Sequence, residues 1–118
     1  MKAPTPINYV ELSSSDRAAS QRFFEHAFGW QFTDYGPAYC GFDNAGIDGG
    51  IAQATDGAVA ASALVVLFAE DLDAARRAIE DAGGEITVAP FDFPGGRRFH
   101  FREPGGTDLA VWAQPAPG

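Results

Sequence analysis

One pattern occurs twice in this chain, and the repeat restricts the possible folds more than any other feature of the sequence. The segment "VELSSSDRAASQRFFEHAFGW" covers 10–30, and "VVLFAEDLDAARRAIEDAGGE" covers 65–85. A shift of 55 residues superimposes them, and a shift of 60 places "AGIDGGIAQ" (45–53) on "GGTDLAVWA" (105–113). The second shift also pairs Cys40 with His100. Repeats of this kind indicate similar structural units that pack together. We therefore expect two modules of about fifty-five residues.

Each module reads as a strand, a helix and three further strands. The expected helices cover 16–28 and 72–82, the first with an N-cap from Ser13–Ser15 and a C-cap at Gly29. An apolar stripe of the first helix is expected to face the core, and consists of Ala19, Phe23, Phe24, Ala27 and Phe28. The expected strands of the first module cover 7–12, 31–35, 39–42 and 49–53. Those of the second cover 64–68, 85–89, 98–102 and 109–113.

A length of 118 residues fits a single domain that can bury its own core. We expect module one at about 6–53, a linker at about 54–62, module two at about 63–114, and a disordered end at 115–118. The Gly-rich segment "FPGGRR" (93–98) lacks the lysine and spacing of a phosphate-binding loop, so we interpret it as a hairpin that closes over a binding site as a lid.

The charge balance excludes several classes of partner. The formal net charge is −8, with 16 acidic and 8 basic residues, so the clustered cations that nucleic acids and anionic membranes require are missing.

The single cysteine, Cys40, forms no disulfide within the chain, and we expect it to be buried and inert. The first residues do not resemble a signal peptide, and no run is long enough to span a membrane. We therefore expect a cytoplasmic protein.

The order of elements resembles the vicinal oxygen chelate superfamily, which includes glyoxalase I, bleomycin-resistance proteins and extradiol dioxygenases. The resemblance rests on the first repeat, on "AEDLDAARRAIEDAGGEI", and on "FREPGGTDLAVW", where Gly105 and Thr107 depart from the family's pattern. It implies an α+β fold in which two βαβββ modules curl their sheets around a cavity (the glyoxalase/bleomycin resistance/dihydroxybiphenyl dioxygenase fold). A ferredoxin-like or dimeric α+β barrel is the alternative, but it leaves the strands at 49–53 and 109–113 unexplained.

The resemblance also predicts where metal ligands would lie. Metal-dependent members of the family take one ligand from the first and one from the last strand of each module, usually His or Glu. The matching positions here hold no histidine or carboxylate. They are Ile7, Asn8 or Tyr9 on the first strand of module one, Ser62, Ala63 or Leu64 at the first strand of module two, and Gly50 and Ala110 on the last strands. We therefore predict no metal ligands and no cofactor.

Strand alternation predicts which side chains face the cavity instead. Apolar partners such as Leu12, Leu67 and Val111 are expected to pack under the helices. The opposite face then carries the predicted ligand-binding residues, which are Tyr9, Leu64, Val66, Phe68, Arg98 and Trp112. Glu11 and His100 on the same face are the predicted catalytic residues, each as a proton-transfer base, and each also has a purely structural interpretation, as an ion-paired or backbone-bonded side chain. Phe68 and Trp112 could equally fill the cavity.

The sequence leaves two classes of function open. The first is a metal-free binding protein that holds an aromatic or cationic small molecule, because apolar walls with few polar groups are typical of such sites and negative charge attracts cations. The second is an enzyme, either a lyase, isomerase or dioxygenase with an atypical metal site, or a metal-free enzyme that uses Glu11 or His100. We expect a homodimer, since symmetric dimers are the commonest oligomers.

Overall fold

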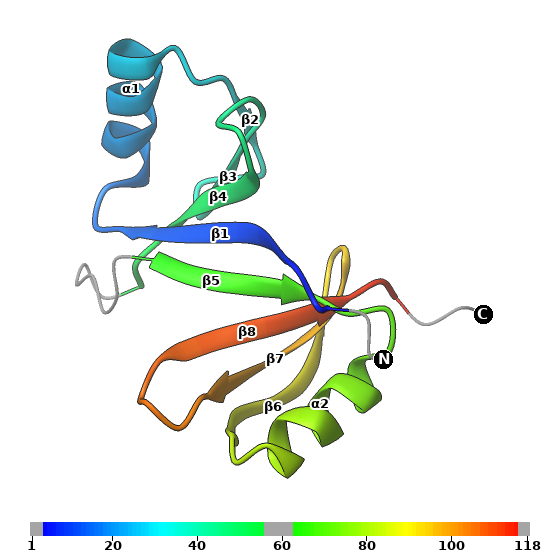
Figure 1. Cartoon of the computed structure of the whole chain (residues 1–118). Helices are drawn as coiled ribbons and strands as arrows, with labels where there is room; N and C mark the ends of the chain where they lie inside the picture. The colour runs from blue at the N-terminus through cyan, green and yellow to red at the C-terminus, as the bar shows by residue number, and fades with distance from the viewer. Residues whose placement is uncertain (1–3, 56–62, 116–118) are drawn as a thin grey trace. The chain divides into compact units, whose positions relative to one another are not determined.

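The computed structural model describes residues 4–55 and 63–115, and it is an α+β fold (Figure 1). Most of the predicted linker, Ser62 and the last residues of the predicted disordered end lie outside the described residues. The elements of the N-terminal module are β1 (Ile7–Ser14), α1 (Arg17–Phe28), β2 (Phe32–Asp34), β3 (Tyr39–Phe42) and β4 (Asp48–Gln53). Those of the C-terminal module are β5 (Ala63–Phe68), α2 (Leu72–Asp81), β6 (Glu85–Phe93), β7 (Gly96–Arg102) and β8 (Asp108–Ala113). The predicted βαβββ order is confirmed in both modules.

The N-terminal unit, Tyr9–Leu64, has the strand order β2-β3-β4-β1. Its last strand, β4, is parallel to β1 and antiparallel to β3. Cys40 and Ile51 are fully buried in its core, beside Phe42, and Phe24 of α1 packs against them. The expectation that Cys40 is buried is confirmed.

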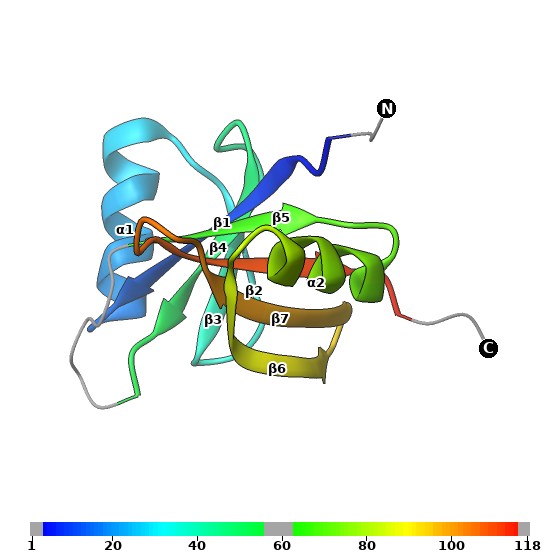
Figure 2. The ribbon, with the colours of Figure 1, turned by 60° about the horizontal axis from the view of Figure 1, so that its bottom comes forward.

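The C-terminal unit, Val65–Gly118 together with Met1–Asn8, has the strand order β5-β8-β7-β6. The backbone N–H of Phe68 donates to the carbonyl of Pro6 at 2.9 Å, so the chain's first described residues belong to this unit. Helix α2 lies along one face of its sheet, as Figure 2 shows. The core under that helix consists of Ala69, Leu72, Phe99, Phe101, Val111 and Ala113, with Leu67 and Leu109 packed against it.

These strand orders decide between the two predicted folds. Strand β4 lies beside β1 and β8 lies beside β5, each pair parallel. The last strand of each module therefore has a defined place, which the ferredoxin-like alternative did not give it.

The predicted N-cap of the first helix is wrong. Asp16 is the N-cap, and its carboxylate accepts a hydrogen bond from the backbone N–H of Ala19 at 3.1 Å. Ser14 instead accepts from the Asp16 N–H at 3.0 Å. Asp71 caps α2 in the same way, accepting from Ala74 at 3.0 Å. At the other end of α1, Gly29 has φ 71°, so the predicted glycine C-cap is confirmed.

The predicted apolar stripe of α1 is only partly correct. Phe24 stacks on Trp30, with ring centroids 4.6 Å apart, and both pack against the N-terminal core. Phe23 and Phe28 are 57% and 63% exposed, and Ala27 is exposed as well. Five apolar positions on twelve helical residues cover more than one face, and the core needs only the face that carries Phe24.

The pairing of Cys40 with His100 is off by one residue. Across the core of the N-terminal module, Leu12 pairs with Ile51 and Ile51 with Cys40. The matching line in the C-terminal module is Leu67, Val111 and Phe99. Cys40 therefore corresponds to Phe99, a shift of 59 residues, because both side chains lie under a helix. His100 corresponds to Gly41, and Arg98 to Tyr39.

The segment "FPGGRR" forms the predicted hairpin. Strands β6 and β7 are longer than expected and meet at a tight turn, where Phe93 pairs with Gly96. The backbone N–H of Gly95 donates to the Phe93 carbonyl at 2.8 Å. Neither helix in the described part of the chain has the length and apolar character needed to cross a membrane.

The packing of β4 yields a stability prediction. A Cβ added at Gly49 would lie 2.1 Å from the Val10 carbonyl oxygen and 2.5 Å from the Phe42 ring. We expect Gly49→Ala to lower the free energy of unfolding by about 1–3 kcal/mol, measured by urea denaturation.

Gly95→Ala is the matched control, because its new Cβ would meet the Phe93 ring only at 3.4 Å. An unchanged urea midpoint for Gly49→Ala would show that β1 and β4 are not packed this closely.

Candidate functional site

The C-terminal sheet has a second face, opposite α2, where four strands place their side chains in two rows. The registers align Phe68, Trp112, Arg98 and Phe91 in one row. They align Val66, Ala110, His100 and Val88 in the other. The predicted alternation is therefore correct here: five of the eight predicted site residues share this face, namely Val66, Phe68, Arg98, His100 and Trp112.

Trp112 lies at the centre of the first row. Its indole N–H donates to the Asn8 side-chain oxygen at 2.9 Å, which fixes the orientation of the ring. The Phe68 ring meets it edge to face with centroids 4.9 Å apart, and the Phe93 ring lies 6.4 Å away. An indole held by a hydrogen bond and flanked by two rings is a rigid aromatic surface.

Arg98 is paired with Trp112 across the sheet and also contacts two phenylalanine rings of β6. Its guanidinium carbon lies 5.4 Å from the centre of the Phe91 ring and 5.8 Å from that of Phe93, within cation–π range. Phe91 is 37% exposed, so part of the surface is accessible. We call this set of residues the aromatic face, and it consists of Phe68, Phe91, Phe93, Arg98 and Trp112.

His100 borders the aromatic face in the second row. Its ring lies 6.0 Å from the Phe91 ring, and the side chain is partly buried. Burial lowers the pKa of His100 below its ordinary value of 6.5, the positive charge of Arg98 lowers it further, and Asp108 acts in the opposite direction. The imidazole is therefore neutral at pH 7, which is the form that accepts a proton.

The other predicted site residues belong to the N-terminal unit. Tyr9 and Glu11 lie on the face of β1 opposite Leu12, and Leu64 lies near the start of β5. The hydroxyls of Tyr9 and Tyr39 are hydrogen-bonded to each other. A shared site of these residues with the aromatic face stays a prediction.

Sequence reasoning missed Tyr39 as a candidate functional residue. A Cβ at Gly50 would lie 2.3 Å from the Tyr39 hydroxyl and 2.5 Å from its ring, so the tyrosine lies directly against the bare backbone of β4. The glycine pair at 49–50 was the available signal, because glycine within a strand often marks a close approach of another group.

The positions that match the family's metal ligands do not fit a metal. Tyr39 occupies the space at Gly50, and Ala110 is fully buried without a donor atom. Within the described residues, no three histidine, cysteine or acidic side chains gather closely enough to hold an ion. Among the described residues, these positions therefore do not supply the histidine and carboxylate donors that the family's metal-dependent members use.

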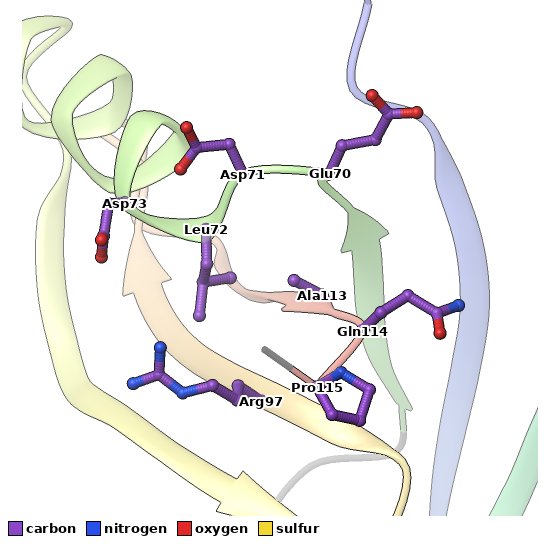
Figure 3. A pocket seen from close by; sticks show the side chains of 8 residues that line it. All are labelled: Glu70, Asp71, Leu72, Asp73, Arg97, Ala113, Gln114 and Pro115. Atoms are coloured by element: carbon purple, nitrogen blue, oxygen red, sulfur yellow. The ribbon is translucent and has the colours of Figure 1, made fainter. Parts of the chain in front are cut away.

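Two open depressions lie away from the predicted site residues. One of them, in the C-terminal unit, has a volume of about 390 Å³. Figure 3 shows its lining residues, with Leu72 below a rim of Glu70, Asp71 and Asp73. Asp71 already caps α2, and Arg97 on the opposite side is bonded to Asp92 at 3.0 Å. The other is lined by Arg22, Glu25 and His26 on α1. His26 is exposed there.

Comparison with known proteins identifies the family. The model of the Glyoxalase/Bleomycin resistance protein/Dioxygenase superfamily matches residues 6–111. The chain belongs to this superfamily. The resemblance predicted from the repeats is confirmed over nearly the whole chain.

Two curated relatives come from anthracycline-producing pathways, according to their names. The anthracycline biosynthesis protein DnrV of Streptomyces peucetius is 32% identical over 93% of this chain, and DauV of Streptomyces sp. (strain C5) is 31% identical over the same share. The chain spans about half of their length, 47% in each case.

Solved structures show the same fold at low sequence identity. The methylmalonyl-CoA epimerase of Streptomyces coelicolor matches with a TM-score of 0.74 and 14% identity, over 98% of this chain and all of that one. The Mn(II)-bound glyoxalase of Novosphingobium aromaticivorans matches with a TM-score of 0.68 and 23% identity, over 97% of this chain and 41% of that one. At these identities the likeness establishes the fold alone.

The lowered pKa of His100 predicts a pH dependence. In the unfolded chain a histidine titrates near 6.5, so as the pH falls below that value the unfolded state binds a proton before the folded state does. The contribution of His100 to stability is therefore complete above about pH 6.5 and is lost as the pH falls towards its folded pKa.

We expect NMR titration of the His100 ring to give a pKa below 6.5, and Arg98→Gln to raise it without restoring it fully, because burial is the larger cause. In urea denaturation, His100→Gln should flatten the fall in stability as the pH decreases below 6.5. A His100 pKa at or above 6.5 would contradict the burial described here.

Proposed function

We propose that this protein binds a planar aromatic small molecule on the aromatic face of its C-terminal module, without a metal ion. The observation that carries the proposal is the Trp112 indole, which Asn8 holds by a hydrogen bond and the Phe68 ring meets edge to face, with the Arg98 guanidinium over the neighbouring Phe91 ring. Apolar and aromatic walls with few oriented polar groups are typical of small-molecule sites.

The curated relatives support an aromatic ligand. Their names place them in anthracycline biosynthesis, and anthracyclines are fused polycyclic aromatic compounds. A fused ring system has the size and flatness to stack on an indole and to contact phenyl edges, which are the groups that the aromatic face offers. The relatives are about twice as long as this chain, so their whole activity is not carried over.

The proposal is tested with 9-anthracenemethanol, an uncharged fluorescent tricyclic probe, by fluorescence anisotropy. We expect Trp112→Leu and Phe91→Leu each to weaken binding about two- to twelvefold, because an aromatic contact contributes about 0.5–1.5 kcal/mol. Phe28→Leu is the matched control, since Phe28 is an aromatic residue on α1 and 63% exposed.

Each variant is first checked for a cooperative thermal transition. Equal loss of affinity in all three variants, or none in any, would contradict binding at the aromatic face. The Phe91 variant keeps the test valid if loss of the Trp112–Asn8 hydrogen bond unfolds the first variant.

The enzyme reading has one specific observation in its favour. His100 is partly buried, its lowered pKa keeps it neutral at pH 7, and it borders the aromatic face. In that reading His100 would accept a proton from a bound ligand, and Arg98 would lie near the negative charge that forms. The test is exchange of an acidic C–H of a bound aromatic ketone in D₂O. Exchange that is lost in His100→Gln, with unchanged affinity, would support the enzyme.

A further inference from the structure

The N-terminal module has its own face opposite its helix, and it differs in kind from the aromatic face. Cys40 and Phe42 point into the core under α1, so Tyr39 and Gly41 lie on the other side of β3. Glu11, Gly50 and Gly41 are aligned across β1, β4 and β3. Of these three aligned positions, only Glu11 carries a side chain.

Tyrosine rings cover the two bare glycines. Tyr39 lies against Gly50, as described above, and a Cβ at Gly41 would lie 3.1 Å from the ring of Tyr35. The two rings are 6.3 Å apart and tilted by 44°. The Tyr39 hydroxyl is bonded to that of Tyr9, which neighbours Glu11 on the same face of β1. All three tyrosines of the chain are thus gathered here beside one carboxylate.

The corresponding positions of the C-terminal module show what the glycines change. His100 occupies the position that corresponds to Gly41 of the N-terminal module, and Trp112 occupies the position that corresponds to Ala52. These two positions carry bulky side chains in the C-terminal module, whereas Gly41 and Gly50 in the N-terminal module leave room for the rings of Tyr35 and Tyr39. The phenols therefore present both ring surface and oxygen atoms beside Glu11.

We propose that the face formed by Tyr9, Tyr35, Tyr39 and Glu11 is a binding site for an organic ammonium ion. Aromatic faces attract cations, and a phenol oxygen or carboxylate accepts hydrogen bonds from N–H donors. An ionised carboxylate has several acceptor positions, so Glu11 can act here while it also keeps another partner. Tyr35 is 67% exposed, which leaves the rim of this face open to solvent.

The charge of the chain favours this class of ligand. A formal net charge of −8 attracts small cations to the molecule and repels anions. The same charge also creates weak, unspecific attraction over the whole surface, so the test must locate the bound cation.

The test is NMR titration of the ¹⁵N-labelled protein with n-butylammonium, with butan-1-ol as its uncharged counterpart. Neither probe has an aromatic ring, so neither stacks on the aromatic face, and this proposal can fail or succeed independently of the proposed function. We expect amide shifts at Gly41 and Gly50 with the ammonium ion. At the same concentration, butan-1-ol should cause shifts that are at least tenfold smaller.

Variants identify the groups that bind. Glu11→Gln removes the charge and Tyr39→Phe removes only the phenol oxygen, and we expect each to weaken ammonium binding severalfold. Trp112→Leu, on the other module, should leave it unchanged. Glu25→Gln removes one negative charge from the exposed surface of α1, outside this face, and is the matched charge control, with the affinity of the natural protein.

Four results would overturn the proposal. The first is the absence of amide shifts at Gly41 and Gly50, and the second is equal shifts with butan-1-ol. The third is shifts spread over acidic side chains throughout the surface. The fourth is unchanged affinity in folded Glu11→Gln and Tyr39→Phe variants. Each variant's spectrum reports whether it is folded, so loss of structure cannot be mistaken for loss of the site.

Discussion

The parallel pairing of the first and last strands in each module is the constraint on which the rest of the structure depends. It aligns Leu12 with Ile51 in one module and Leu67 with Val111 in the other, and these side chains meet their helix. Successive residues of a strand point to opposite faces of the sheet. Burial of these four side chains under the helices therefore places the residues on either side of each on the other face. Trp112, Arg98 and Glu11 owe their positions to that assignment.

Much of the fold could be predicted from the sequence because the repeats carry it. The order of elements and the faces of β5, β7 and β8 follow from alternation, and the core positions Phe99, Phe101 and Val111 are where that pattern places them. The errors have local causes. Asp16 rather than a serine caps α1, since serine and aspartate are nearly equal as N-caps and the sequence offers both.

The candidate site was harder to predict, because it depends on contacts between residues that are distant in the sequence. The hydrogen bond from Trp112 to Asn8 joins residues 104 positions apart in the sequence, and no local sequence pattern predicts it. A shift of 60 makes Tyr39 correspond to Phe99, which lies under a helix. The shift of 59 that the structure gives makes it correspond to Arg98, on the other face, where Tyr39 lies against Gly50. An error of one residue exchanges the two faces of a strand, which is why Cys40 was matched to His100 rather than to Phe99.

The superfamily shares a fold, while the chemistry depends on which side chains face away from the helices. In this chain one module presents fixed aromatic rings with a guanidinium and a neutral imidazole, and the other presents phenols with a carboxylate. Glycine accounts for much of this difference, because the absence of a side chain at positions 41 and 50 makes room for tyrosine rings. Two copies of one fold can thus offer two kinds of surface.

The central claim is that the aromatic face binds its ligand without a metal ion. The most direct test is the affinity for 9-anthracenemethanol before and after dialysis against a chelator, with the metal content of both samples measured by inductively coupled plasma mass spectrometry. Metal-free binding predicts the same affinity in both samples. Binding that disappears on chelation and returns with one divalent metal would contradict it.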